Sequence, residues 1–240
     1  MISDKKGNFI KNVPKRGIAL EEAYQQIKRM LYLNELVPGQ KLVYNDLAKR
    51  LNISVTPVIQ ALNRLEASKI VTYIPNRGYF VDAITESEAR NLYQAREALE
   101  VFSIPAIIEN LDSKDLNAIK ETFKKHGEGI HDKNRRELIL LDCKFHLKIC
   151  EFGHNEVICR LLGEILEQMS IKYTSEYLGE DRIKEVIKEH RELLNAFRRA
   201  DIGDAIRITR QHIRKGMEHV VSSLNKKSEL QIDQIFLTTA

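Results

Sequence analysis

The sequence contains little of what turn-rich, secreted or membrane-spanning proteins are made of. Its 240 residues include 11 glycines, 5 prolines and no tryptophan, and so few turn-forming residues disfavour an all-β architecture. No run approaches the ~18–20 apolar residues that cross a bilayer, and the N-terminal segment has charges but no apolar stretch of a secretory signal. We therefore expect a cytoplasmic, mostly helical protein that does not enter a membrane.

Cysteine is scarce as well. Cys143, Cys150 and Cys159 form an odd-numbered set without a CxxC pair, which is typical of a protein from a reducing cytoplasm. We interpret all three as buried thiols that fill apolar space.

Charge is plentiful and unevenly distributed. Residues 1–83 hold 13 Lys and Arg against 7 Asp and Glu, whereas residues 84–240 hold 25 against 27. A basic N-terminal part joined to a slightly acidic larger part is typical of a nucleic-acid binder that carries a second module. A small positive excess is also ordinary solvated surface, so charge alone leaves both interpretations open.

The N-terminal part has the pattern of a winged helix-turn-helix. A first helix is predicted over Ala19–Glu35, followed by two short helices over 44–51 and 55–67 that a three-residue turn joins. Two β-rich runs, 70–74 and 78–81, flank a turn and predict a hairpin. A hairpin placed directly after a helix-turn-helix is a wing.

Local signals mark where several helices start. Ser54 is a favourable N-cap, and Pro57 lies within the first turn, where its missing N–H costs nothing. Two later starts carry similar signals, namely the Thr-Glu-Ser-Glu run that begins at Thr85, and Ser113 followed by Asp115.

The rest of the chain is helical throughout. From Thr85 onward every segment repeats with the period of an amphipathic helix, and six helices without strands predict an antiparallel bundle that has room for a core and a pocket. The expected fold is therefore mainly α: an N-terminal winged helix-turn-helix followed by an all-helical antiparallel bundle of about six helices. The predicted helices are 87–110, 113–130, 134–152, 155–178, 181–200 and 202–225.

A set of short motifs lies within this frame in a fixed order. They are Pro38-Gly39, Leu42, Leu47-Ala48, Leu51, Ser54, Thr56-Pro57-Val58, Ala61-Leu62, Arg64-Leu65-Glu66 and Asn76-Arg77-Gly78, then Arg96-Glu97-Ala98-Leu99-Glu100. The first group, within Leu36–Val81, resembles the winged helix of GntR-type transcription regulators. The last motif resembles the opening helix of the all-helical effector domain of the FadR subgroup, the FCD type. The resemblance covers about residues 19–225.

Four side chains of the helical part could bind a metal ion. Asp142 and His146 are four residues apart, so a helix places them on one face, while His190 and His212 stand beside apolar residues of later helices. One carboxylate and three imidazoles suit Zn²⁺, Ni²⁺, Mn²⁺ or Fe²⁺. Taken singly, each histidine is more commonly a packed or surface residue.

The resemblance favours the metal site. FCD domains commonly hold a metal through an Asp-x-x-x-His pair and two later histidines, which implies that Asp142, His146, His190 and His212 bind a divalent cation, with Zn²⁺ favoured. It also implies that Arg96 faces the pocket and pairs with a carboxylate effector, since guanidinium binds carboxylates through two hydrogen bonds. The alternative for Arg96 is an internal salt bridge to Glu100.

The resemblance also implies where DNA is contacted. In a winged helix the start of the second motif helix enters the major groove, and the wing tip approaches the minor groove. The residues expected to contact DNA are Ser54, Val55, Thr56, Gln60, Asn63, Arg64, Asn76, Arg77 and Gly78.

Three positions depart from the family pattern. Val55 and Ile59 stand where such regulators typically have arginines that read guanine. We favour apolar contacts to thymine methyl groups, with Gln60 and Asn63 reading adenine; the alternative is a surface that meets a protein instead of DNA. Lys69 stands where a glycine usually follows the recognition helix, and it costs on the order of 1 kcal/mol if that position is left-handed.

The sequence therefore predicts a homodimeric transcription regulator that binds double-stranded operator DNA and senses a small carboxylate effector next to a divalent metal. The alternatives are a metal-dependent enzyme that activates water at the Asp/His/His/His centre, and a regulator whose metal is purely structural. The expected division is a flexible basic tail (1–17), a winged-helix DNA-binding domain (18–83), a helical domain for effector, metal and dimerisation (84–228) and a C-terminal tail (229–240).

Overall fold

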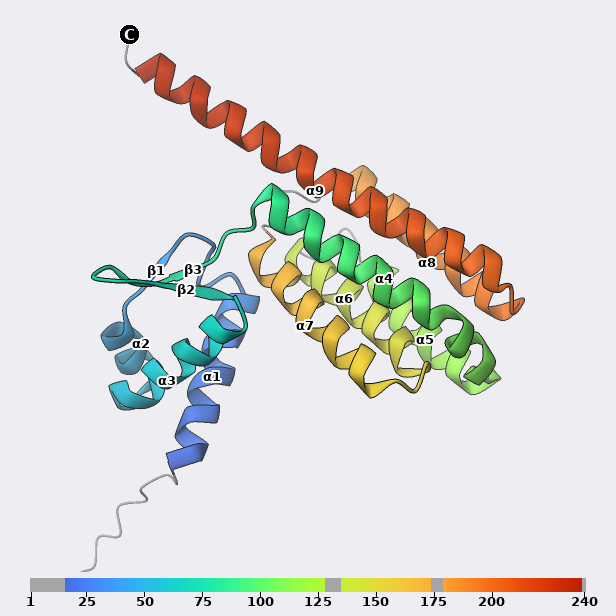
Figure 1. Ribbon diagram of the computed structural model, residues 1–240, viewed down its shortest axis with the longest axis horizontal. Helices are drawn as coiled ribbons and strands as arrows, with labels where there is room; N and C mark the ends of the chain where they lie inside the picture. The colour runs from blue at the N-terminus through green and yellow to red at the C-terminus, as the bar shows by residue number, and fades with distance from the viewer. Residues whose placement is uncertain (1–15, 128–134, 174–178, 239–240) are drawn as a thin grey trace, which may run out of the picture.

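The computed structural model describes residues 16–127, 135–173 and 179–238 (Figure 1). The predicted tail over residues 1–17 lies outside the described residues up to residue 15, and the first helix already begins at Arg16. Within the described part of the chain, no helix is long and apolar enough to span a membrane.

The N-terminal part is a winged helix-turn-helix. Its three helices share one apolar core, in which Ile27 of the first helix meets Val58, Leu62 and Leu65 of the third, because those three recur at helical spacing. The antiparallel sheet has the order β1-β3-β2, and β2 and β3 form the wing. The elements are α1 (Arg16–Tyr32), β1 (Lys41–Leu42), α2 (Tyr44–Leu51), α3 (Val55–Ala67), β2 (Val71–Ile74) and β3 (Gly78–Val81).

The helix starts follow the sequence signals in part. The Thr85 side chain accepts a hydrogen bond from the backbone of Glu88 at 3.2 Å, as a capping residue does. Ser54 occupies the N-cap of α3, but its side chain makes no capping hydrogen bond. At the fifth helix the cap is Asp112 rather than Ser113. The Asp112 carboxylate accepts hydrogen bonds from the backbone amides of Lys114 at 2.7 Å and Asp115 at 2.8 Å.

Among the described residues, the helical part contains six helices, as predicted, and Figure 1 shows them packed as a bundle. The predicted helices over 113–130 and 155–178 extend into residues that lie outside the described ones, and the last helix continues to Thr238, beyond the residue 225 at which the sequence pattern ends it. Figure 1 shows this helix projecting past the start of α4. The helices are α4 (Glu86–Asn110), α5 (Ser113–Gly127), α6 (Arg135–Glu151), α7 (Glu156–Lys172), α8 (Glu180–Arg198) and α9 (Ile202–Thr238).

The last turn of α7 connects the two parts of the molecule. Ile171 belongs to the apolar core of the winged helix rather than to that of the bundle. Glu167 forms an ion pair with Lys28 of α1 and accepts a hydrogen bond from the Tyr32 hydroxyl at 3.1 Å. The C-terminal ends of α1 and α7 are therefore held together by both apolar and charged contacts.

A buried arginine from a third helix reinforces this junction. Arg136 of α6 is 6 % exposed, and its guanidinium donates to the carbonyl oxygens of Tyr32 at 2.8 Å and Leu31 at 3.3 Å. The same group donates to the carbonyls of Ser170 and Tyr173 at the end of α7. One side chain thus satisfies the free carbonyl groups at the ends of two helices from different parts of the chain.

Candidate metal centre and adjoining cavity

The structure brings the four predicted ligand residues together inside the bundle. Asp142 and His146 come from α6, His190 from α8 and His212 from α9, and one donor atom of each lies within 4.8 Å of all the others. The three histidines are buried, and Asp142 is half-buried. Residues far apart in the sequence therefore meet because three neighbouring helices turn their inward faces to one point.

The donor atoms face one another at short distances. Nε2 of His146 lies 3.1 Å from Nε2 of His212 and 3.2 Å from Nε2 of His190. Oδ1 of Asp142 lies 3.3 Å from Nε2 of His190 and 3.7 Å from Nε2 of His146. A cation bound ~2.0–2.1 Å from each nitrogen holds neighbouring donors about 3.0–3.4 Å apart, so the observed spacing fits one divalent ion.

The outer nitrogen atoms of two of these rings are held by buried carboxylates. Nδ1 of His146 lies 2.8 Å from Oε2 of Glu100, and Nδ1 of His212 lies 2.8 Å from Oε2 of Glu189. An ionised carboxylate only accepts hydrogen bonds, so each Nδ1 carries a proton, and each ring when neutral presents the Nε2 lone pair to the centre. Two lone pairs that face each other at 3.1 Å repel unless positive charge lies between them.

Each carboxylate is in turn held by an arginine. Arg96 Nε donates to Glu100 Oε1 at 2.6 Å, and Arg182 contacts both oxygens of Glu189 at 3.0 Å. Two chains of the same kind, Arg–Glu–His, therefore end at the candidate metal centre. Although burial raises the pKa of Glu100, Arg96 and His146 outweigh it and lower that pKa to about 2, so the carboxylate stays ionised.

Burial also sets the state of the histidines. It lowers the pKa of His190 well below its usual range and that of His212 to about 4. For His146 burial acts in the same direction, but the adjoining Glu100 carboxylate outweighs it and raises the pKa. The arrangement therefore favours neutral rings at two positions and positive charge at the centre of the cluster.

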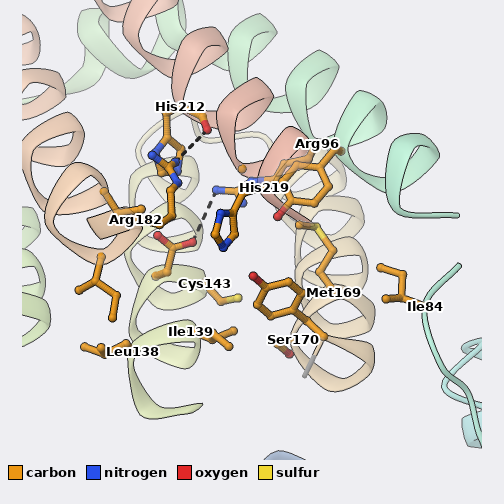
Figure 2. Close-up of a pocket in the computed structure, with 16 residues that line it drawn as sticks. Ile84, Arg96, Leu138, Ile139, Cys143, Met169, Ser170, Arg182, His212 and His219 are labelled. Carbon is orange, nitrogen blue, oxygen red and sulfur yellow. Dashed lines mark hydrogen bonds and ion pairs between the residues drawn. The ribbon is translucent and has the colours of Figure 1, made fainter. Parts of the chain in front are cut away.

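A cavity of about 90 Å³ adjoins this centre, and Asp142 and His212 form part of its wall. Figure 2 shows Arg96, Arg182, His212 and His219 gathered on one side of it, with Leu138 and Ile139 on the opposite side. A polar end beside the candidate metal and an apolar remainder suit a small ligand with one charged group.

Arg96 combines the two roles that the sequence left open. It is 4 % exposed, its Nε is bonded to Glu100, and Glu100 stands four residues later, as the salt-bridge alternative requires. Arg96 is among the residues that line the cavity, and its Nη2 lies 3.9 Å from Asp142 Oδ2 and has no hydrogen-bond partner. One half of the guanidinium is therefore structural, and the other half is available to a ligand.

Several residues of this site were not predicted from the sequence. Arg182 and Glu189 complete one Arg–Glu–His chain, Glu100, expected only as a partner of Arg96, also holds His146, and His219, which is not among the predicted site residues, lines the cavity. Glu189 directly precedes His190, and His219 follows His212 by two helical turns, so spacing could have suggested both. Pairing between separate helices, as of Glu100 with His146 and of Glu189 with His212, has no signal in a single sequence.

The predicted DNA-contacting residues fall into two groups. Ser54, Thr56 and Gln60 are exposed at the start of α3, Asn76 and Arg77 lie in the turn between β2 and β3, and Gly78 is the first residue of β3. Asn76 and Gly78 have φ angles of 62° and 92°, the left-handed geometry that a tight hairpin turn needs.

The second group has partners inside the winged helix. Asn63 accepts a hydrogen bond from the Tyr79 hydroxyl. Arg64 pairs with Glu21 of α1 at 2.6 Å, and its guanidinium lies 3.9 Å from the Tyr24 ring. Both are exposed, but their polar groups are already engaged toward the wing and α1.

The departures from the family pattern have local explanations. Val55 and Ile59 are half-buried, and Val55 packs against the core of the winged helix, so these side chains are only partly turned outward. Lys69 has a φ of 55°, and the amide of the next residue, Ile70, donates to the carbonyl of Leu65 at 3.0 Å. This bond closes a Schellman turn around a left-handed lysine.

Comparison with known families identifies both parts of the chain. Residues 19–81 match the family described as bacterial regulatory proteins, gntR family, and residues 91–215 match the FCD domain. The first match spans the winged helix, and the second contains all four candidate ligand residues.

Individual relatives agree with this division. The chain is 23 % identical to the uncharacterized HTH-type transcriptional regulator YdhC of Bacillus subtilis (strain 168), over 86 % of this chain and 92 % of the relative. It is 24 % identical to the HTH-type transcriptional regulator McbR of Escherichia coli (strain K12), over 73 % and 80 %.

Solved structures show the same fold. The structure of E. coli McbR/YncC matches with a TM-score of 0.75 at 21 % identity, over 85 % of this chain and 98 % of that one. A putative GntR regulator from Rhodococcus sp. RHA1 matches with a TM-score of 0.74 at 16 % identity, over 85 % and 97 %.

Proposed function

Because the chain belongs to the GntR family of bacterial regulators, with a C-terminal domain of the FCD type, we propose that its helical part binds a divalent metal and a small organic acid that modulate operator binding. The chain is a transcription regulator and not an enzyme, in line with the relatives it matches. We assign DNA binding to residues 18–83 and metal, effector and dimer contacts to residues 84–228; of the flanking segments 1–17 and 229–240, residues 16–17 belong to α1 and residues 229–238 to α9.

The metal proposal rests on one observation, the Nε2 atoms that face one another while carboxylates hold the opposite sides of two rings. Asp142, His146, His190 and His212 would hold the ion, and Glu100 and Glu189 would orient two of the rings. A bound cation would supply a positive charge beside the cavity, which would attract a carboxylate. The nitrogen-rich set favours Zn²⁺ over Mg²⁺ or Ca²⁺, which prefer oxygen ligands.

Elemental analysis of the purified chain tests this proposal. We expect about one Zn²⁺ per chain, lost in His146→Ala and His190→Ala but kept in His154→Asn, which removes an exposed histidine outside the cluster. Asn is the control because His154 has a φ of 50°, a conformation that asparagine tolerates. Equal metal content in all three variants contradicts the site.

The effector proposal rests on Arg96. Arg96 lines the cavity, and its Nη2 lies 3.9 Å from Oδ2 of the candidate ligand Asp142 and has no hydrogen-bond partner, so a carboxylate would pair with both this donor and the cation. We expect Arg96→Met to weaken binding of acetate, lactate and citrate to the metal-loaded protein, measured by calorimetry, more than ten-fold. A purely structural metal predicts no carboxylate binding in either protein; against that alternative, Asp142 and His212 line the cavity instead of being sealed from it.

The homodimer proposal rests on apolar side chains that the single chain leaves exposed. Phe102 of α4 is 72 % exposed and Val157 of α7 is 59 % exposed, and α4 and α7 are neighbours (Figure 1). A second copy of this chain would cover them. Light scattering should give a dimer for the native protein and a monomer for Phe102→Glu.

The operator proposal follows from the dimer and the winged helix. Ser54, Thr56 and Gln60 would enter the major groove, with Val55, Asn63 and Arg64 beside them, and Asn76, Arg77 and Gly78 would approach the minor groove. Two-fold symmetry predicts a palindrome whose half-sites are about one helical turn apart. We expect Arg77→Ala to weaken binding to all DNA sequences about equally, because the wing contributes mainly phosphate contacts. A mobility-shift assay would measure this loss.

The junction gives the effector a route to the DNA-binding part. Ser170 and Tyr173 line the cavity, and their carbonyls are bound by the same Arg136 guanidinium that holds the end of α1. A ligand that binds best to one arrangement of Ser170 and Tyr173 would therefore stabilise one position of α1 through Arg136. The position of α1 would in turn set the spacing of the two winged helices in the dimer.

A further inference from the structure

Two of the three cysteines lie against each other at the turn between α6 and α7. Cys150 is in the last turn of α6 and Cys159 in the first turns of α7, and their sulfur atoms are 3.1 Å apart. Both are free thiols in the structure. A disulfide needs ~2.05 Å between sulfur atoms, so an approach of about 1 Å separates the two thiols from a bond.

The surroundings hold the pair in this position. Amides of the α6–α7 turn donate to carbonyls of the last α6 turn, including Gly153 to Cys150 at 3.0 Å. Leu162 and Leu166 pack around the sulfur atoms. The two helix ends are thus fixed side by side, and neither thiol has to be brought from a distance.

We propose that Cys150 and Cys159 form a redox modification site, which a hydroperoxide converts to an intramolecular disulfide joining α6 to α7. This inference is independent of the metal and effector proposals. The bond ties the helix that carries Asp142 and His146 to the helix whose last turn contacts the winged helix.

The chemistry proceeds in two balanced steps. Cys159 is the more exposed of the pair, so its thiolate attacks the peroxide, takes one oxygen as a sulfenic acid and releases water after proton transfer. The Cys150 sulfur then attacks the sulfenic sulfur, the S–S bond forms and a second water leaves. In total two thiols are oxidised and one hydrogen peroxide is reduced to two waters.

Cys143 provides an internal control. It lies two helical turns before Cys150 on α6, and its sulfur is 3.8 Å from a backbone carbonyl of Leu166. Two helical turns separate the Cα atoms of Cys143 and Cys150 by about 10.5 Å, which is more than a disulfide spans. A site defined by the pair should therefore leave Cys143 unmodified.

Thiol counting and peptide mapping of the full chain test the proposal. After hydrogen peroxide, the thiols titrated in denaturant should fall from three to one, with the mass loss of two hydrogen atoms and a peptide linking Cys150 to Cys159. Dithiothreitol should restore three. Cys143→Ser should fall from two to none, and in Cys150→Ser the sulfenic acid of Cys159 should be captured by dimedone.

The outcomes that overturn the proposal are equally definite. Retention of three thiols after peroxide, a link that includes Cys143, or a link between two chains each excludes the site. The decisive map is made on the native sequence, so a folding defect in a serine variant does not affect it.

Discussion

The two halves of the chain bury different kinds of side chain. The winged helix has one continuous core made of apolar residues, whereas the apolar residues of the bundle fall into four separate clusters. All of the buried polar and charged side chains among the described residues lie in the bundle. The core of the DNA-binding half is thus formed by apolar burial and its ion pairs lie near the surface, as between Arg64 and Glu21, while the effector half also buries charged groups that need partners.

The largest expected effect on the free energy of unfolding comes from removing one partner of a buried ion pair. Glu100→Ala leaves the Arg96 guanidinium buried beside only a distant carboxylate and leaves the His146 ring without its outer acceptor. A buried charge that loses its partner costs about 3–5 kcal/mol of unfolding free energy, which urea titration would measure.

The matched control is Glu97→Ala on the same helix. Glu97 also contacts two arginines, Arg210 and Arg214, but near the surface. We expect a loss of about 1 kcal/mol or less, because water replaces the lost contacts. If both variants lose the same free energy of unfolding, charge buried in the bundle costs no more to unpair than charge at its surface, and burial of charge would not set this half apart.

Metal removal should affect one half only. A cation at one hundred times its dissociation constant stabilises the fold that binds it by about 2.7 kcal/mol. We expect a chelator to lower hydrogen-exchange protection in α6, α8 and α9, which carry the candidate ligands, and to leave α2 and the strands unchanged. Loss of protection spread evenly over both halves would show that the ion does not act where its ligands lie.

A substitution that removes the charge of Glu189 but keeps its size tests what the carboxylates contribute to metal binding. Glu189→Gln keeps the size of the side chain and an oxygen that can accept from His212 Nδ1, but removes the charge that Arg182 and His212 share. Partners of this kind typically change metal affinity 10–100-fold, so Zn²⁺ titration should show a loss in that range. Glu185→Gln is the control, because it contacts the same arginine at 3.1 Å but no histidine.

How much the sequence could predict also differs between the halves. The helix-turn-helix and the wing follow from local spacing and turn residues, and both are present in the structure. Asp142 and His146 share a helix face by the same local rule, and the resemblance added His190 and His212. The contacts of Glu189 with His212 and of Arg136 with the ends of α1 and α7 join separate segments, which no periodicity reveals.

The smallest predicted effect lies in the apolar half, at Lys69. The sequence suggested a cost of about 1 kcal/mol if this position is left-handed, and its φ of 55° shows that it is. Lys69→Gly should therefore stabilise the winged helix by about 1 kcal/mol or somewhat less, since glycine also gains freedom in the unfolded chain. Thermal unfolding of the DNA-binding half would measure this gain, with Lys49→Gly, an exposed site in the last turn of α2, as the control that should lose stability. If Lys69→Gly is also destabilising, the lysine side chain contributes more than its backbone strain costs, and the half without buried charge would depend on a charged residue at its surface.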